Sequence, residues 1–426
     1  MLSDNHSRPV AVVGYNRIPF ARNNTAYSNA GNIDMMTAAL NGLIGRYQLQ
    51  GQYLGEVAGG AVIKSSREIN LMRESALNTT LDPTTPTCDL QQACNTGIEA
   101  AIYIANKISL GQIEAGIAGG VDSASDVPLV LGEKLRKILL TARRPGTTGK
   151  KLREFLKIRP ADLKPVAPMN MEPRTGLSMG GHTDITAKYY GISREDQDRY
   201  ALESHQKMAK AYDQGFFADM FTPYHGLDHD NILRRDTSLE KLSRIKPAFN
   251  KDWGTLTAGN SSPLTDGASC ILLSTEEWAK QHDLPVLAYL RFAEVAAIEF
   301  VQNKHNLLLA PVYATARMLA KAGLRLQDFD FYEIHEAFAA QVLALLKIWE
   351  SPELIRQFGY NEPFGSIDLT RLNVCGSSLA AGHPFAATGG RIMAVMAKLL
   401  YQKGSGRGFV SVCAAGGQGV TLIMER

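Results

Sequence analysis

Four reactive side chains stand beside small residues in the sequence. Cys94 lies in Gln-Gln-Ala-Cys-Asn-Thr-Gly97, His335 in Glu-Ile-His-Glu-Ala-Phe, His383 in Ala-Gly-His-Pro, and Cys413 in Val-Cys-Ala-Ala-Gly-Gly. Substrate must approach a nucleophile or a base closely, and small neighbours leave room for that approach. A histidine near a cysteine can take its proton, and a second acid/base can serve the leaving group. The set predicts nucleophilic catalysis by a cysteine.

A helical pattern follows Cys94 at once. Apolar residues recur at three- and four-residue spacing, which stripes one face of a helix; they are Ile98, Ala101, Ile102, Ala105 and Ile108. Cys94 is therefore expected at or just before a helix N-terminus, where unpaired N–H groups and the helix dipole favour a thiolate. Gly97 is expected where another backbone or a substrate comes close.

Each residue has a purely structural alternative. Free cysteines are usually buried and behave as small hydrophobes, so Cys94 and Cys413 also fit a core. His335 fits a strand-end histidine bonded to backbone, and His383 fits a helix cap. The joint occurrence of all four favours catalysis. Cys88, Cys270 and Cys375 are interpreted as packing residues.

Length and composition bound the class of protein. A chain of 426 residues exceeds the size of a single core, so two or more lobes are expected. With 45% hydrophobic and 20% charged residues it is typical of a globular protein, and no apolar run could cross a bilayer. Five cysteines without a Cys-x-x-Cys spacing argue against a disulfide framework and against a structural zinc site. The segment Met1 to Pro9 lacks a targeting signal, so we expect a cytoplasmic protein.

Strands that alternate with helices predict an α/β fold in three parts. Residues 1–124 and 254–286 form an N-terminal lobe, and residues 287–426 form a C-terminal lobe. Residues 125–253, which have few strand-like runs, form an inserted and mostly helical domain. Both lobes place a cysteine or a histidine before a glycine-containing buried helix, which indicates an internal duplication.

Several elements are expected at specific residues. In the lobes we expect a helix from Met35 to Leu49, a strand from Tyr53 to Val62, and a helix that His383 caps, with Pro384 at its first position. In the inserted domain, Ser193 is expected to cap a helix that runs from Arg194 to Gly215.

One part of the inserted domain is strongly basic. Between Glu133 and Lys164 eleven basic residues stand against three acidic ones. A helix is expected from Val127 to Leu139, with one apolar face formed by Val127, Leu131, Leu135 and Ile138. A basic amphipathic helix fits an anionic membrane or a partner protein. The alternative is a basic face that packs on its own domain and attracts coenzyme A phosphates.

The four motifs together resemble the thiolase family, and the resemblance covers essentially the whole chain. Cys94 and Gly97 match its Cys-x-x-Gly, and His335 to Phe338 match its Asn/His-Glu-Ala-Phe. Gly382 to Pro384 match its Gly-His-Pro, and Cys413 to Gly419 match its Cys-x-x-Gly-Gly-x-Gly. The resemblance implies a five-layered αβαβα arrangement of two duplicated α/β lobes with an inserted loop domain.

The resemblance also implies the chemistry. Cys94 would be the nucleophile that carries an acyl thioester, His383 its base, and Cys413 the second acid/base. His335 would serve one oxyanion site, and the backbone N–H groups of Cys94 and Ala415 the other. The residues implied to contact coenzyme A or substrate are Met179, Ser262, Ala337 and Phe338. Coenzyme A would be a co-substrate, with no tightly bound cofactor and no metal.

Two departures from the commonest pattern point to a subgroup. His335 replaces the commoner Asn, and Ala415 replaces a frequent Gly, so that its methyl group narrows the pocket. These features resemble the thiolase subunits of fatty-acid-oxidation complexes. That subgroup implies thiolysis of medium- or long-chain 3-ketoacyl-CoA by a homodimer bound to a hydratase/3-hydroxyacyl-CoA dehydrogenase α-subunit, with peripheral membrane contact and no nucleic acid.

Three alternatives remain. A biosynthetic acetoacetyl-CoA thiolase would use the same residues for Claisen condensation. Another condensing enzyme, such as a ketoacyl synthase, has no need of a second cysteine acid/base, which Cys413 supplies. A non-catalytic acyl-CoA carrier would be under no constraint to hold all four reactive residues.

Overall fold

The structure, a computed structural model, describes residues 7–426; most of the N-terminal segment from which we expect no targeting signal lies outside them. Within the described residues one ten-stranded sheet runs through the molecule. Its strand order is β4-β3-β5-β6-β1-β7-β10-β9-β8, and β2 pairs with β6. No helix in this part of the chain combines the length and the apolar character that a membrane span requires.

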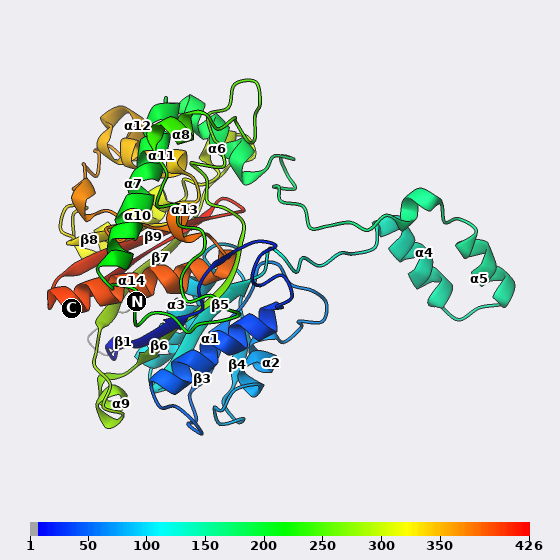
Figure 1. Cartoon of the computed structure of the whole chain (residues 1–426), viewed down its shortest axis with the longest axis horizontal. Coiled ribbons are helices and arrows are strands. Elements are labelled where there is room, and N and C mark those ends of the chain that lie inside the picture. Colours follow the sequence, from blue (N-terminus) through cyan, green and yellow to red (C-terminus); the bar gives the residue numbers. More distant parts are fainter. Residues whose placement is uncertain (1–6) are drawn as a thin grey trace.

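The two halves of the sheet repeat the same order of elements (Figure 1). The N-terminal half consists of β1 (Val10–Arg17), β2 (Ala21–Arg22), α1 (Asn32–Arg46), β3 (Glu56–Gly59), α2 (Leu71–Leu77), β4 (Thr87–Asp89), α3 (Thr96–Ser109), β5 (Ala115–Asp122) and β6 (Thr265–Ser274). The C-terminal half, after α9 (Glu276–Gln281), consists of β7 (Ala288–Ala297), α10 (Pro311–Ala322), β8 (Phe331–Ile334), α11 (Ala339–Glu350), α12 (Pro352–Arg356), α13 (Ser378–Ala381), α14 (Thr388–Lys403), β9 (Arg407–Ala414) and β10 (Gln418–Glu425). The orders β1-β6-β5-β3 and β7-β10-β9-β8 mirror each other about the β1–β7 pair, as an internal duplication requires.

Three large apolar cores lie between the five layers of the described structure. One core joins α1 and α2 to the N-terminal half of the sheet, and a second joins α10 and α11 to the C-terminal half. The third, central core contains α3 and α14 together with strands of both halves. The expected αβαβα arrangement is thus confirmed. The two sheets are continuous, however, because β1 and β7 pair at Val10↔Leu290, Ala11↔Tyr289 and Val12↔Ala288.

Some expected element boundaries are wrong. Helix α1, expected from Met35 to Leu49, begins at Asn32 and ends at Arg46. Strand β3, expected from Tyr53 to Val62, covers only Glu56–Gly59. Pro384 does not begin a helix. Its ψ of 96° is extended, and a short 3-10 turn, η4 (Phe385–Ala387), precedes α14. The backbone N–H of Ala386 donates to the buried carboxylate of Asp122 (2.8 Å), which stabilises this separate turn.

The inserted segment leaves the sheet after β5 and returns at β6, its antiparallel neighbour. It contains α4 (Glu133–Arg143), α5 (Thr148–Phe155), η1 (Pro160–Leu163), α6 (Met179–Tyr189), α7 (Arg194–Asp213) and α8 (Leu239–Ser243). The hydroxyl of Ser193 accepts from the backbone N–H of Asp196 (3.0 Å), so the expected cap of α7 is confirmed. The division of the chain at residues 125, 254 and 287 stays a proposal.

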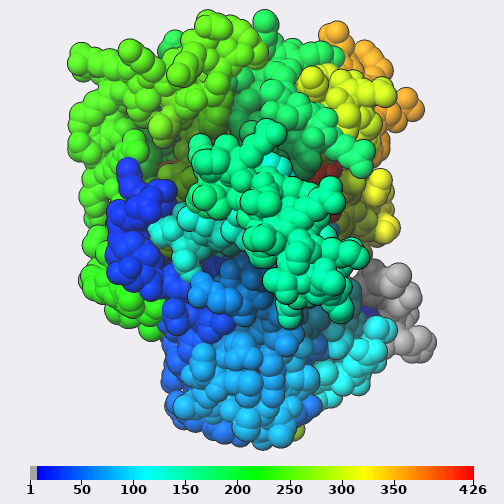
Figure 2. Space-filling model, turned by 90° about the vertical axis from the view of Figure 1, so that its right-hand side faces the viewer, coloured from blue at the N-terminus to red at the C-terminus, as the bar shows by residue number. Residues whose placement is uncertain are grey.

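Helices α4 and α5 stand away from the body on an extended arm, residues 128–170, which Figure 1 shows from the side and Figure 2 from its tip. Helix α4 begins at Glu133, later than expected, and its buried residues are Leu135, Ile138 and Ala142. The expected apolar face is therefore only partly available to a partner, because α4 packs against α5 and buries much of it. Leu131 precedes the helix and stays half-exposed.

Candidate active site

Three of the four reactive side chains converge. The Sγ atom of Cys94 lies 3.1 Å from Nε2 of His383, and the rings of His335 and His383 are 4.1 Å apart. Cys94 precedes α3 and His383 precedes α14, which are the two central helices, while His335 follows β8. The internal duplication thus brings the predicted nucleophile and its predicted base together from residues 289 positions apart.

A strained turn aims Cys94. Ala93 adopts a left-handed φ of +48°, a conformation that costs a non-glycine residue about 1–2 kcal/mol. Helix α3 begins two residues after Cys94, as expected. At Gly97 a Cβ atom would lie 2.6 Å from the carbonyl oxygen of Ala386, so the expected close approach is made by backbone. The turn and this contact hold Cys94 against the segment that follows His383.

His383 is oriented by a second hydrogen bond. Its Nδ1 lies 2.5 Å from the hydroxyl of Thr388, in the first turn of α14, and its backbone N–H donates to Thr265 (2.7 Å). The tautomer with its proton on Nδ1 donates to Thr388 and leaves Nε2 to accept from Cys94. His383 can therefore act as a base toward the thiol.

Both partners are neutral at rest. Burial raises the pKa of the Cys94 thiol to about 12, and an N–H of Ala415 offsets this only in part. Burial, together with the positive charge of Arg391, lowers the pKa of His383 to about 3. The helix N-terminus favours a thiolate, as expected, but burial outweighs it and keeps the resting group a thiol. Proton transfer from Cys94 to His383 must accompany nucleophilic attack.

Cys413 is buried in β9 beside this pair. Burial raises the pKa of its thiol well above the ordinary value, and a negative charge on Cys94 raises it further. Two residues on, the backbone N–H of Ala415 is directed at the Cys94 sulfur, which it stabilises as a thiolate. A second thiol and a backbone donor therefore both face the nucleophile.

His335 presents an unpaired nitrogen to the site. Its Nδ1 lies 2.7 Å from the hydroxyl of Ser378, whose oxygen also accepts from Arg391 (2.9 Å). With its oxygen used by Arg391, Ser378 can donate its own hydrogen to Nδ1, which places the ring proton on Nε2. That Nε2 is buried and has no hydrogen-bond partner among residues 7–426. Burial lowers the pKa of His335 well below its usual value, so the ring is a neutral donor.

The same residues are the candidate metal ligands. In the described part of the chain, Cys94, His335 and His383 are the one cluster of this kind, with ligand atoms within 4.8 Å of one another. The roles predicted for these three residues, proton transfer and oxyanion binding, need no metal ion. The expectation of no metal stays a prediction.

A cavity of about 700 Å³ opens onto Cys94. Ala415 and Gly416 line one side of it, and Met179 lies on its wall, as expected for a substrate contact. Residues at both ends of the arm and just beyond them also line the cavity, at Val127–Pro128 and Pro168–Pro173. The cavity lining is more apolar than polar, which suits an acyl chain.

Of the other three predicted contact residues, Ser262 and Ala337 pair with each other, and Phe338 pairs with the neighbouring Ser261. The backbone N–H and the hydroxyl of Ser262 both donate to the carbonyl of Ala337 (3.0 Å each). Phe338 forms a bridge with Ser261 and is buried. None of Ser262, Ala337 and Phe338 lines the cavity as the structure describes it. They hold the segment that carries His335.

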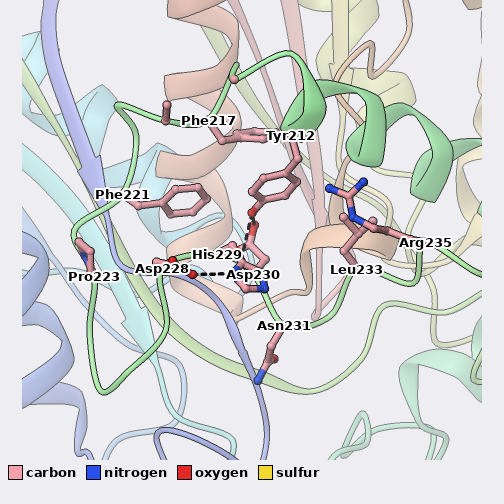
Figure 3. A pocket seen from close by; sticks show the side chains of 12 residues that line it. Tyr212, Phe217, Phe221, Pro223, Asp228, His229, Asp230, Asn231, Leu233 and Arg235 are labelled. Carbon is pink, nitrogen blue, oxygen red and sulfur yellow. Dashed lines mark hydrogen bonds and ion pairs between the residues drawn. The ribbon is translucent and has the colours of Figure 1, made fainter.

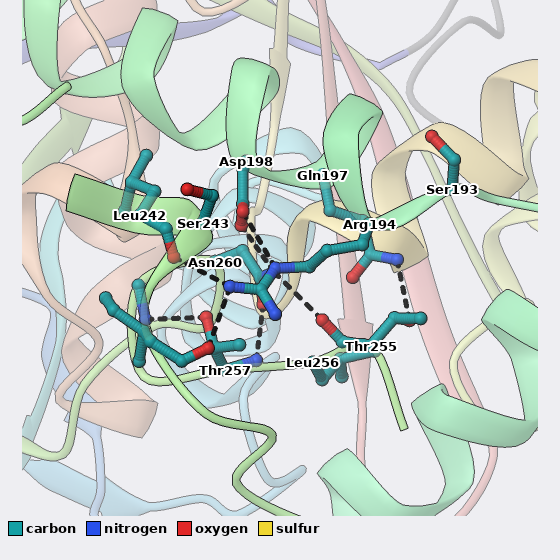
Figure 4. Close-up of polar contacts among 12 residues, drawn as sticks. Ser193, Arg194, Gln197, Asp198, Leu242, Ser243, Thr255, Leu256, Thr257 and Asn260 are labelled. Carbon is teal, nitrogen blue, oxygen red and sulfur yellow. Dashed lines mark hydrogen bonds and ion pairs between the residues drawn. The ribbon is translucent and has the colours of Figure 1, made fainter. Parts of the chain in front are cut away.

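Helix α7 anchors the loop that contains Asn260 through a hydrogen-bond network that the sequence motifs did not reveal (Figure 4). Asp198 accepts from Arg194 (2.7 Å) and from the amide of Asn260 (2.9 Å). The carbonyl of Asn260 then accepts from the backbone N–H of Ala339 (3.0 Å). The inserted segment thereby reaches the start of α11, four residues beyond His335.

Asp122 is a second buried residue of the site that the sequence motifs did not indicate. It ends β5, is fully buried, and accepts from the backbone N–H groups of Val62, Ile63 and Ala386. Burial raises the pKa of its carboxyl to about 7. Its position after a strand of small residues was the one available signal. Asp122 fixes two segments of the cavity wall.

A second hollow, of about 740 Å³, lies at Tyr212, Phe221 and Arg235 (Figure 3). Its buried carboxylate, Asp230, is held by both terminal nitrogens of Arg17 (2.6 and 2.7 Å) and by the Tyr212 hydroxyl (2.9 Å). The four reactive side chains all lie within the described residues, and none lines this hollow. Its polar groups serve the fold.

Comparison with known proteins identifies the family. Models of the thiolase N-terminal and C-terminal domains match residues 10–277 and 284–426. A 3-ketoacyl-CoA thiolase of Yersinia pestis (strain Pestoides F) is 38% identical over 423 residues, which are 98% of this chain and 96% of that protein. The chain therefore belongs to the thiolase family, and it is an acyltransferase.

Solved structures agree. The acetyl-CoA acetyltransferase of Bacillus anthracis aligns with a TM-score of 0.83 at 30% identity, over 99% of this chain and 100% of that one. Human mitochondrial 3-ketoacyl-CoA thiolase aligns with a TM-score of 0.78 at 27% identity, over 98% and 99%. The human enzyme in complex with CoA aligns equally well, over 98% of both chains at 28% identity.

Proposed function

We propose that this thiolase cleaves 3-ketoacyl-CoA with coenzyme A, as the name of its Yersinia relative suggests. The observation that carries the proposal is the 3.1 Å contact between the Cys94 sulfur and Nε2 of His383, which can accept the thiol proton. A backbone donor at Ala415 and the thiol of Cys413 lie beside this contact. Nucleophile, base, oxyanion donor and second acid/base are the groups that this reaction needs.

The first half-reaction transfers the acyl group to Cys94. Nε2 of His383 takes the thiol proton while the sulfur attacks the 3-keto carbonyl carbon. The resulting oxyanion is stabilised by the N–H groups of Cys94 and Ala415. The C2–C3 bond then breaks, and the enolate of acetyl-CoA leaves, stabilised by the free Nε2–H of His335. Cys413 gives its proton to C2, which completes acetyl-CoA.

The second half-reaction releases the shortened chain. The Cys413 thiolate takes the proton of an incoming coenzyme A thiol, whose sulfur attacks the thioester on Cys94. The new acyl-CoA leaves, and His383 returns the proton to Cys94. Coenzyme A is a co-substrate in this scheme, and every proton transfer is performed by side chains of this chain.

Acetyl-CoA condensation is the second candidate, because the Bacillus anthracis acetyltransferase aligns over the whole chain. It would run the same steps in reverse. The cavity favours the degradative reaction, since its apolar wall of Val127, Met169 and Met171 offers more room than an acetyl group fills. A non-catalytic carrier would not require the base contact between Cys94 and His383.

The arm supports a role at a membrane or at a partner subunit. Its three acidic residues, Glu133, Glu154 and Asp162, each pair with a basic residue of the arm. Because the arm has eleven basic residues, most of its positive charge is not neutralised by acidic groups of the arm. Leu139 and Leu140 are 36% and 47% exposed on α4. Basic and apolar groups together suit an anionic lipid surface. We propose peripheral membrane contact, a homodimer, a hydratase/dehydrogenase partner and a cytoplasmic location.

A thiolysis assay tests the proposed function. Purified protein is given coenzyme A and 3-ketoacyl-CoA substrates from acetoacetyl-CoA to long-chain species, with Cys94→Ser as the inactive control. The proposal requires cleavage that is faster with medium or long chains than with acetoacetyl-CoA. Activity confined to acetoacetyl-CoA would favour the condensing enzyme, and no turnover with any substrate would favour a carrier.

A further inference from the structure

The hairpin between β9 and β10 carries the backbone donor at Ala415, and its tip has little stiffness of its own. Gly416 and Gly417 follow with φ of +77° and +68°, so two successive residues without side chains lie in the left-handed region. Glycine is the most flexible residue in the chain, and its preferred conformations do not fix a hydrogen-bond donor. An oxyanion donor must be held within a few tenths of an ångström. Contacts from elsewhere must therefore fix this tip.

One contact comes from the C-terminal half itself. The backbone N–H of Ile298 donates to the carbonyl of Gly417 (2.8 Å). A Cβ at Gly417 would also lie 2.6 Å from the ring of Phe300. These contacts hold the far side of the tip and leave the peptide between Ala415 and Gly416 to be fixed from the cavity side.

The second contact comes from the inserted segment. Oε1 of Glu172 accepts from the backbone N–H of Gly416 at 2.6 Å, across 244 residues of sequence. Glu172 is only 6% exposed and lines the cavity next to Gly416. Its own backbone is fixed, because its N–H donates to Leu177 (2.8 Å) and its carbonyl accepts from Gly176 (2.8 Å). A buried carboxylate on a fixed backbone thus accepts from the N–H of Gly416, the residue after Ala415.

We propose that Glu172 is a positioning residue for the oxyanion site. It holds the peptide that joins Ala415 to Gly416, and through the Ala415 Cα it limits rotation of the preceding peptide, which carries the Ala415 N–H directed at the Cys94 sulfur and at the oxyanion that forms there. Glu172 closely follows the arm in the chain, so the same contact links the end of the arm to the catalytic centre. This inference rests on the proposed roles of Cys94 and Ala415.

Two reactions of Cys94 separate positioning from general stability. Acylation by 3-ketoacyl-CoA uses the Ala415 N–H for both the Cys94 thiolate and the oxyanion, whereas alkylation by iodoacetamide uses it for the thiolate alone. Loss of an oxyanion donor costs ~10²–10³-fold, so a displaced donor should cost at least ~10-fold. Glu172→Ala is expected to slow acylation by at least ~10-fold and to slow alkylation by a smaller factor. Glu172→Gln keeps a carbonyl oxygen for Gly416 and is expected to restore most of the acylation rate.

The full-length protein with a matched control makes the test decisive. Glu195, an exposed α7 residue paired with Arg199, supplies the control Glu195→Ala, which should behave as wild type. Wild-type acylation rates in Glu172→Ala, a parallel fall in alkylation, or a Gln variant as slow as the Ala variant would each overturn the proposal. A wild-type protein that is not acylated at Cys94 would instead refute the proposed function, and this inference with it.

Discussion

Replacing Gly97 with alanine should slow catalysis without unfolding the protein. The added Cβ would lie 2.6 Å from the carbonyl oxygen of Ala386. An ordinary C···O contact is about 3.3 Å, so α3 and the segment after His383 must separate by about 0.7 Å. The contact of 3.1 Å between Cys94 and His383 would then lengthen to about 3.8 Å, beyond the reach of proton transfer. Misplacement by an ångström costs ~10²-fold, so we expect kcat to fall by ~10–100-fold.

Gly45 provides the control for this variant. It lies in α1, and nothing stands within 4 Å of its added Cβ, so Gly45→Ala should leave kcat unchanged and stabilise the helix by up to ~1 kcal/mol. Steady-state thiolysis gives kcat, and urea unfolding gives the stability of both variants. Overpacking at Gly97 should cost about 1–3 kcal/mol, too little to unfold the chain. A Gly97→Ala variant with wild-type kcat would refute the reasoning.

Three further predictions concern other parts of the molecule. Cys413→Ser should still be acylated at Cys94 but turn over at least ~10²-fold more slowly, and near-normal turnover would make Cys413 a packing residue. Burial raises the pKa of Glu333 to about 8, so the folded state keeps a proton that the unfolded state loses above about pH 4.5. Rising pH therefore destabilises the wild type between these two pKa values. The melting temperature of Glu333→Gln minus that of the wild type should be larger at about pH 8 than at about pH 5. An equal difference at both pH values would contradict this reasoning. Leu139→Ser with Leu140→Ser should weaken sedimentation with vesicles of anionic phospholipid while acetoacetyl-CoA thiolysis persists, and unchanged sedimentation would exclude the arm as a lipid contact.

Local patterns predicted much of the fold. The spacing of apolar residues after Cys94 located α3, and the capping sequence at Ser193 located α7. The reactive residues before two glycine-containing helices indicated the duplication that brings Cys94 to His383. Short-range periodicity and caps suffice for such elements, because they depend on a few neighbouring residues.

The parts that sequence reasoning missed depend on residues far apart in the chain. Helix α14 begins later than expected because Asp122, 264 residues away in the sequence, accepts a hydrogen bond from the N–H of Ala386 and stabilises a separate turn. The resting charge of Cys94 depends on burial that no local pattern reports, and the helix N-terminus alone suggested the opposite. The apolar face of α4 was correctly predicted, but much of it packs against α5 of the same arm.

Trapping the acyl intermediate tests the central claim most directly. The protein is mixed with a 3-ketoacyl-CoA in the absence of free coenzyme A, quenched in acid and digested, and the acyl mass is located by mass spectrometry. The 3.1 Å contact with His383 predicts the acyl group on the peptide that contains Cys94. His383→Ala should lower its rate of appearance by ~10²–10⁴-fold. An acyl group on Cys413, or on neither cysteine, would contradict the assignment of Cys94 as the nucleophile.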